Sequence, residues 1–157
     1  MNEAIEALSI STRGGPAFGG QHSALSTFPV EIPVCALIVK NNTLISKVTN
    51  RVESLIDATA HAEIIAIQEA SKVFKNWRLN GCTLYVTLEP CPMCAGAILN
   101  SRISTLVFGA YDLNLGACGS KINLFSDLGK ELQVEVIGGV LELKAVKLLK
   151  DFFVLKR

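Results

Sequence analysis

Two short segments of the chain carry the residues best suited to chemistry, residues 59–63 and residues 88–97. Together they supply one imidazole, two thiols and one free carboxylate, from His61, Cys91, Cys94 and Glu63. A hydrolytic zinc site needs three protein ligands, an open fourth position and a nearby group that carries protons. The residue types therefore predict one Zn²⁺ per chain, held by the imidazole and the two thiols.

The spacing of the two cysteines indicates a helix that begins beside the metal. Cys91 and Cys94 are three positions apart, so on a helix they share one face. Pro92 suits the first helical position, where its missing N–H costs nothing. We therefore expect a helix that begins at about Cys91. Its partial positive N-terminal charge favours thiolates, as the metal does.

The spacing of His61 and Glu63 predicts a second helix N-terminus at the site. Each residue turns a helix by about 100°, so residues two apart point to different sides. Both can serve one site only if it lies off the helix N-terminus, and Asp57 and Thr59 are suitable capping residues just upstream. We expect Glu63 to carry protons beside the metal rather than to bind it. The rival carboxylate, Glu89, precedes a proline and is expected to shape the turn into the cysteine helix.

Other interpretations of the cysteines remain open at this point. A lone C-x-x-C in a reducing compartment can be a redox pair or half of a structural zinc site. A structural site usually has four protein ligands, however, and the sequence contains no second C-x-x-C and no H-x-x-x-H. The combination of H-x-E with a later P-C-x-x-C resembles the pattern of zinc-dependent nucleobase deaminases, which favours the catalytic interpretation.

Size and composition indicate one globular domain. The chain has 157 residues, of which 50% are hydrophobic, and we expect residues 1–157 to form a single zinc-dependent domain. Residues 1–30 contain a glycine-rich stretch and are expected to be atypical, as a loop or a mobile N-terminal arm. A net charge of +1 does not indicate a strong nucleic-acid binder, so any such role would need a local basic patch.

Composition also gives an expectation about location. The odd number of cysteines, five, does not suggest a disulfide framework and fits a reducing compartment. No apolar run approaches the roughly 20 residues of a membrane span, and residues 1–6 lack a signal region, so we expect no membrane association. A cytoplasmic location is expected, and an organelle is not excluded.

The hydrophobic pattern predicts an α/β fold in three layers. An apolar run, an Asn41-Asn42 turn and a second run predict a hairpin, after which strands alternate with helices. We expect a mixed five-stranded sheet sandwiched between helices, with the His61 and Cys91 helices side by side on one face. The expected strands are residues 34–39, 43–49, 83–87, 104–108 and 133–137, and the expected long helices are residues 60–74, 91–100 and 141–152.

From about Glu31 to Arg157 the chain resembles the bacterial-type tRNA-specific adenosine deaminases of the cytidine deaminase superfamily. The zinc motif marks only the superfamily, whereas blocks after Cys94 point to the tRNA enzymes. The matching stretches are residues 31–34, 50–51, 60–64, 83–98, 101–103, 108–112, 116–120 and 151–153. The resemblance implies a cytidine deaminase-like fold and a zinc-dependent hydrolase that converts adenosine to inosine at the tRNA wobble position, as a homodimer.

The resemblance also implies roles for residues that bind the substrate. Asn50 would hydrogen-bond the flipped base, and Asp112 would contact the sugar–phosphate of a neighbouring anticodon-loop nucleotide. The C-terminal helix, with Phe153, Lys156 and Arg157, would lie against the anticodon stem-loop.

One position and one short stretch besides the N-terminal segment depart from the pattern of the family. Cys35 stands where the family usually has glycine, and residues 113–115 (Leu-Asn-Leu) replace a more polar stretch that often carries lysine. Two other functions stay open: a deaminase of a free base or nucleotide such as guanine, cytosine or dCMP, and a non-catalytic RNA-binding partner with a structural zinc. The presence of Glu63 argues against the second, because a structural site has no use for a proton carrier.

Overall fold

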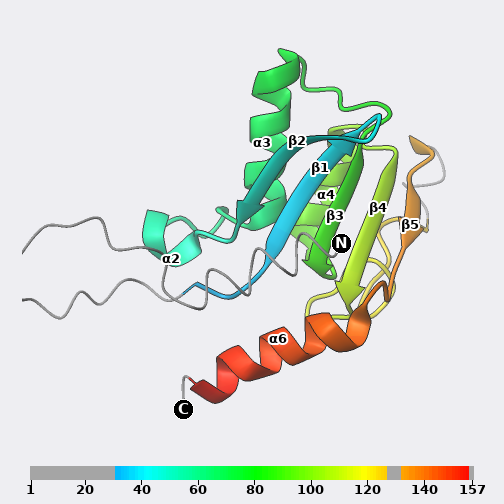
Figure 1. The fold of residues 1–157 in the computed structure, drawn as a ribbon. Coiled ribbons are helices and arrows are strands. Elements are labelled where there is room, and N and C mark those ends of the chain that lie inside the picture. Colours follow the sequence, from blue (N-terminus) through cyan, green and yellow to red (C-terminus); the bar gives the residue numbers. More distant parts are fainter. Residues whose placement is uncertain (1–30, 127–131, 156–157) are drawn as a thin grey trace, which may run out of the picture.

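A mixed five-stranded sheet forms the centre of the protein in a computed structural model that describes residues 31–126 and 132–155 (Figure 1). The strand order is β2-β1-β3-β4-β5. β1 is antiparallel to both of its neighbours, whereas β3, β4 and β5 are parallel to one another. The strands are β1 (Cys35–Lys40), β2 (Thr43–Thr49), β3 (Thr83–Leu88), β4 (Thr105–Ala110) and β5 (Glu135–Ile137).

The β1–β2 hairpin forms where the sequence predicts it. Asn41 and Asn42 connect the two strands, and both have positive φ, at 49° and 58°. A two-residue hairpin turn of this kind needs positive φ at both positions, and asparagine tolerates it better than most residues. Lys40 and Thr43 therefore pair directly across the turn.

Helices cover both faces of the sheet, as expected. With the labels of Figure 1, they are α2 (Val52–Leu55), α3 (Ala62–Phe74), α4 (Pro92–Asn100) and α6 (Glu142–Leu155). α3 and α4 contact each other and lie together behind the strands, whereas α6 runs separately near the carboxyl end of β4 (Figure 1). The crossover between the parallel strands β3 and β4 passes through α4, which contains the predicted ligand Cys94 and has the predicted ligand Cys91 as its N-cap.

Alternation along β1 separates the two layers of packing. Ala36 and Ile38 point into the main core with the small α3 residues Ala66 and Ala70, all of them fully buried. The intervening residues Cys35 and Leu37 face the other side, together with Tyr85 of β3 and Leu148 of α6. The period-2 pattern of a strand therefore places α3 and α4 on one face and α6 on the other.

These observations confirm the three-layer α/β/α class and the mixed five-stranded sheet. The short α2 was not expected from the sequence, and β5 begins at Glu135 rather than at residue 133. The expectation for residues 1–30 lies outside the described residues, and so do Lys156 and Arg157. Among the helices of the described part, none combines the length and the apolar character that crossing a membrane requires.

Candidate active site

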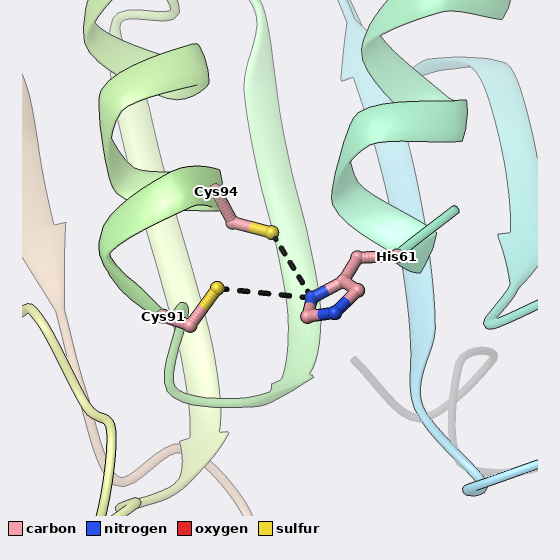
Figure 2. A group of neighbouring side chains, drawn as sticks. All are labelled: His61, Cys91 and Cys94. Atoms are coloured by element: carbon pink, nitrogen blue, oxygen red, sulfur yellow. Dashed lines mark hydrogen bonds between the residues drawn. The ribbon is translucent and has the colours of Figure 1, made fainter. Parts of the chain in front are cut away.

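His61, Cys91 and Cys94 lie together, as the sequence predicts (Figure 2). The Nδ1 atom of His61 is 3.7 Å from the Sγ atom of Cys91 and 3.5 Å from the Sγ atom of Cys94. With Zn–S of about 2.3 Å and Zn–N of about 2.0 Å, a tetrahedral zinc separates sulfur from nitrogen by about 3.5 Å. The three side chains therefore match the shape and the donor set of a zinc site.

Two helix N-termini place these ligands. His61 is the N-cap of α3 and Cys91 the N-cap of α4, and both have extended backbone. Neither side chain makes a capping hydrogen bond, so both remain available to a metal. Pro92 occupies the first turn of α4, and its rigid φ favours the helical start there. The prediction that both helices begin at the site is therefore confirmed.

The prediction that Asp57 or Thr59 caps the first of these helices is wrong. Asp57 Oδ1 instead accepts hydrogen bonds from the backbone N–H of Thr59 at 2.8 Å and from its hydroxyl at 2.7 Å. The local side-chain–backbone turn satisfies the aspartate before the helix begins. α3 consequently starts only at Ala62, and the turn delivers His61 to the helix end.

The two thiols of the site differ strongly in acidity. A hydrogen bond from Cys94, which outweighs the effect of burial, lowers the pKa of Cys91 to about 4. The same contact and burial raise the pKa of Cys94, and the hydrogen bond with Cys91 raises the pKa of His61. Of the two thiols, Cys91 is therefore the one that more readily gives up its proton. A divalent cation would displace the remaining proton, and two thiolates with a neutral imidazole would balance its charge.

Glu63 is buried beside the ligand cluster without belonging to it. Its side chain is only 4% exposed, and burial raises the pKa of its carboxyl group. The carboxyl also hydrogen-bonds with the Cys94 side chain. A carboxyl group whose pKa moves toward neutrality next to an open coordination position is suited to proton transfer.

Glu89 has a different environment, which the sequence did not reveal. It is 2% exposed, and its carboxylate accepts hydrogen bonds from the backbone N–H groups of Asp112, Cys118 and Ser120 and from the Ser120 hydroxyl. Burial acts to raise the pKa of Glu89, but these hydrogen bonds together lower it. Glu89 therefore ties residues 112–120 to the segment that connects β3 to α4, residues 89–91, which we call the zinc loop because it carries the proposed ligand Cys91. This is more than the local turn-shaping role expected from its sequence position.

Asn50 is held by a residue to which the sequence analysis gave no role. Asn50 is 8% exposed, and its Nδ2 atom donates to Glu31 Oε2 at 2.9 Å. Glu31 Oε1 accepts from the backbone N–H of Ser54 at 2.8 Å, which links the pair to α2. A carboxylate can only accept, so the amide group faces Glu31 and the Asn50 carbonyl oxygen is left to accept a hydrogen bond. Residues 31–34 match the family pattern, and this match was the available signal for Glu31.

The other predicted substrate contacts lie near the carboxyl end of β4. Asp112 Oδ1 accepts from the backbone N–H groups of Asn114 at 2.9 Å and Leu115 at 3.2 Å, which shapes the loop after β4. Phe153 of α6 is 52% exposed and lines, with Tyr111, a groove of about 420 Å³ between α6 and that loop. Tyr111 directly precedes Asp112, so the groove places Phe153 beside the loop that contains Asp112. Phe153 and Asp112 are 41 residues apart in the sequence.

Comparisons with known proteins agree with this site. Residues 24–157 match the family model of the MafB19-like deaminases. The tRNA-specific adenosine deaminase of Bacillus subtilis (strain 168) is 46% identical over 123 residues, which cover 78% of this chain and 76% of that protein. The chain therefore belongs to the MafB19-like deaminases and, within them, to the family of tRNA-specific adenosine deaminases.

Solved structures give the same family and a wider fold relationship. A structure from a study of A-to-I editing by tRNA:A34 deaminases at the wobble position is 40% identical, with a TM-score of 0.70 over 74% of this chain and 84% of that chain. A guanine deaminase from Nitrosomonas europaea has a TM-score of 0.73 over 98% of this chain and 82% of that chain, at 24% identity. The second likeness concerns the fold alone.

Proposed function

We propose that this protein hydrolytically deaminates adenosine to inosine at the wobble position of tRNA. The observation that carries the proposal is the His61–Cys91–Cys94 triangle with a buried Glu63 beside it. The triangle lies in a chain that is 46% identical to a tRNA-specific adenosine deaminase over most of its length. The site gives the chemistry, and the relatives give the substrate class.

We propose that His61 Nδ1, Cys91 Sγ and Cys94 Sγ hold one Zn²⁺, which would supply an activated water at neutral pH. Glu63 then moves the protons of the reaction. Its carboxylate takes a proton from the attacking water and delivers a proton to the amino group that leaves C6 of adenine. The burial of Glu63 supports this role, because it raises the pKa of the carboxyl group above its ordinary value.

Substrate binding is assigned to two further regions. The Asn50 carbonyl oxygen, oriented by Glu31, accepts a hydrogen bond from the flipped base. Asp112 contacts the sugar–phosphate of a neighbouring nucleotide. Phe153 offers an exposed aromatic face for a base beside the groove that it shares with Tyr111. Lys156 and Arg157 add positive charge at the end of the chain.

The assembly and the location are also proposals. We propose a homodimer, as the resemblance implies. Exposed apolar side chains on the described surface support it, with Ile56 95% exposed and Leu55 48% exposed at the end of α2. The cytoplasmic location expected from the sequence stays a prediction. Sedimentation of the purified protein would test the dimer.

The decisive experiment compares substrates for the zinc-loaded protein. Inosine formation is measured by mass spectrometry on an anticodon stem-loop with A at the wobble position, and ammonia release is measured with guanine, cytosine and dCMP. We expect inosine from the stem-loop and no ammonia from the small substrates. Ammonia from guanine without inosine would make the protein a free-base deaminase, and neither product would favour a non-catalytic role.

A further inference from the structure

We infer that Glu89 is a positioning residue that fixes the RNA-contacting loop, residues 111–120, relative to the zinc loop. This inference rests on the proposed function, since the loop contains Asp112. The carboxylate receives three backbone N–H groups, from Asp112 at 3.0 Å, Cys118 at 2.9 Å and Ser120 at 3.1 Å, in addition to the Ser120 hydroxyl. One side chain therefore holds both ends of the loop.

The contacts connect the two halves of the site through a short path. Glu89 lies two residues before the ligand Cys91, and the backbone of Glu89 donates to the Ala110 carbonyl at 2.8 Å. The Pro90 carbonyl accepts from the N–H of Ala117 at 2.9 Å. The zinc loop and the RNA-contacting loop consequently run together from Ala110 to Ser120, with the Glu89 carboxylate between them.

The loop closes on this carboxylate only because residue 116 has no side chain. A methyl group added at Gly116 would overlap both the Glu89 carboxyl group and the Asp112 carbonyl oxygen. Gly116 does not have positive φ, so the requirement is space rather than backbone conformation. Gly96 of α4 is a matched control, because a methyl group there meets nothing within 4 Å.

The arrangement requires a carboxylate rather than any polar group of similar size. All the partners of Glu89 are donors, and a glutamine would turn an amide N–H₂ toward donors and leave a buried N–H without an acceptor. In Glu89→Gln the charge-assisted hydrogen bonds to residues 112–120 are lost and this loop is released, whereas His61, Glu63 and the two thiols stay in place. The zinc and the proton carrier therefore remain, while the position of Asp112 is lost.

The consequence for kinetics is a change in KM rather than in kcat. A contact to the sugar–phosphate is made equally in the bound and reacting states, so its loss is a loss of uniform binding. We expect Glu89→Gln and Gly116→Ala to raise the KM for the stem-loop about tenfold with kcat nearly unchanged. Ser120→Ala, which removes one donor of four, should give a smaller increase, and Gly96→Ala none.

The test combines steady-state kinetics on the stem-loop with zinc analysis and amide hydrogen exchange of the zinc-loaded full chain. In Glu89→Gln we expect stoichiometric zinc and faster exchange confined to residues 112–120. Ile103→Val, a truncation in the buried core, controls for general destabilisation and should leave KM unchanged. If the Glu89 variant does not fold, Gly116→Ala and Ser120→Ala decide the result.

Two outcomes would overturn the inference. Unchanged exchange in residues 112–120 would mean that Glu89 does not hold the loop, whether or not the protein is active. A fall in kcat at constant KM would make Glu89 a participant in the chemistry. By contrast, a wild-type protein that makes no inosine refutes the proposed substrate, and the exchange measurement still decides the role of Glu89 as an anchor.

Discussion

Two buried glutamates flank the His61–Cys91–Cys94 cluster, which we propose binds zinc, and they have opposite properties. Glu63 lies two residues after His61 and Glu89 two residues before Cys91, and they are 4% and 2% exposed. Burial raises the pKa of Glu63, whereas around Glu89 four hydrogen bonds outweigh burial and lower the pKa. Burial therefore raises the pKa of a carboxyl group that accepts few hydrogen bonds, and a set of hydrogen-bond donors can reverse that effect.

The comparison assigns different work to similar side chains. A carboxylate that accepts four hydrogen bonds gives up its charge only with difficulty, so it serves as a structural anion. A buried carboxyl group whose pKa is raised, as for Glu63, exchanges its proton more easily near neutral pH. These environments suit Glu63 to the proposed proton transfer and Glu89 to the proposed positioning of the loop.

The largest effect is expected when the ligand set shared by both regions is broken. Cys91→Ala removes one of three ligands, so we expect the purified variant to lose stoichiometric zinc and all detectable inosine formation. Metal analysis by plasma mass spectrometry checks the first result. Cys118→Ala is the matched control, because Cys118 is a half-buried thiol outside the cluster and should not affect zinc content. Full zinc occupancy in Cys91→Ala would remove Cys91 from the site.

The next largest effect separates the two glutamates directly. Glu63→Gln keeps the size and burial of the side chain but cannot carry a proton, so we expect kcat to fall by about 10²–10⁴-fold. Zinc content and stem-loop affinity should stay at the wild-type level, since the ligands and the RNA contacts are intact. If Glu63→Gln retained its turnover and Glu89→Gln lost it, the two roles would have to be exchanged.

The sequence predicts the proposed ligands and proton carrier of this site better than it predicts the hydrogen bonds that hold the surrounding loops. The ligands and Glu63 lie in two contiguous motifs, and residue spacing alone indicates that both helices begin at the metal. The partners of Glu89 are mostly backbone N–H groups 23 to 31 residues further along the chain. A backbone donor has no residue-type signature, so such a network becomes visible only in the folded chain.

In the fold, too, features set by neighbouring residues are predictable from the sequence, whereas contacts between distant residues are not. The Asn41-Asn42 turn specifies the hairpin, and the hydrophobic alternation specifies the strands. α3 begins at Ala62 rather than at residue 60, because Asp57 forms a local turn with Thr59 instead of capping the helix. The sequence alone does not distinguish these two uses of an aspartate. The Glu31–Asn50 pair, 19 residues apart, required the tertiary structure.

A smaller effect is expected from removing the Glu31 carboxylate that accepts a hydrogen bond from Asn50. In Glu31→Gln the Asn50 amide can rotate, because its neighbour now offers donors as well as an acceptor. We expect the KM for the stem-loop to rise about tenfold or less, with zinc content unchanged, since a typical hydrogen bond contributes about 0.5–1.5 kcal/mol. Kinetics beside Glu69→Gln, whose carboxylate accepts from Ser46 in another region, give the control. Equal KM values in the two variants would mean that Glu31 does not orient Asn50.

The smallest effect concerns the end of the chain, where the proposed contact is purely electrostatic. With a net charge of +1, the protein attracts RNA only through local groups, and each phosphate contact releases a counterion. We expect Lys156→Ala with Arg157→Ala to weaken stem-loop binding several-fold and to lower the salt slope by about 1.4, the value for two single-strand contacts. Binding titrations at several salt concentrations measure both quantities. Lys47→Ala with Lys72→Ala removes the same charge from exposed positions on β2 and α3, away from α6, so it separates a specific contact from the general loss of charge. An equal change of slope in the two double variants would show that Lys156 and Arg157 act only through net charge. The proposed roles of Glu63 and Glu89 would not be affected by that result.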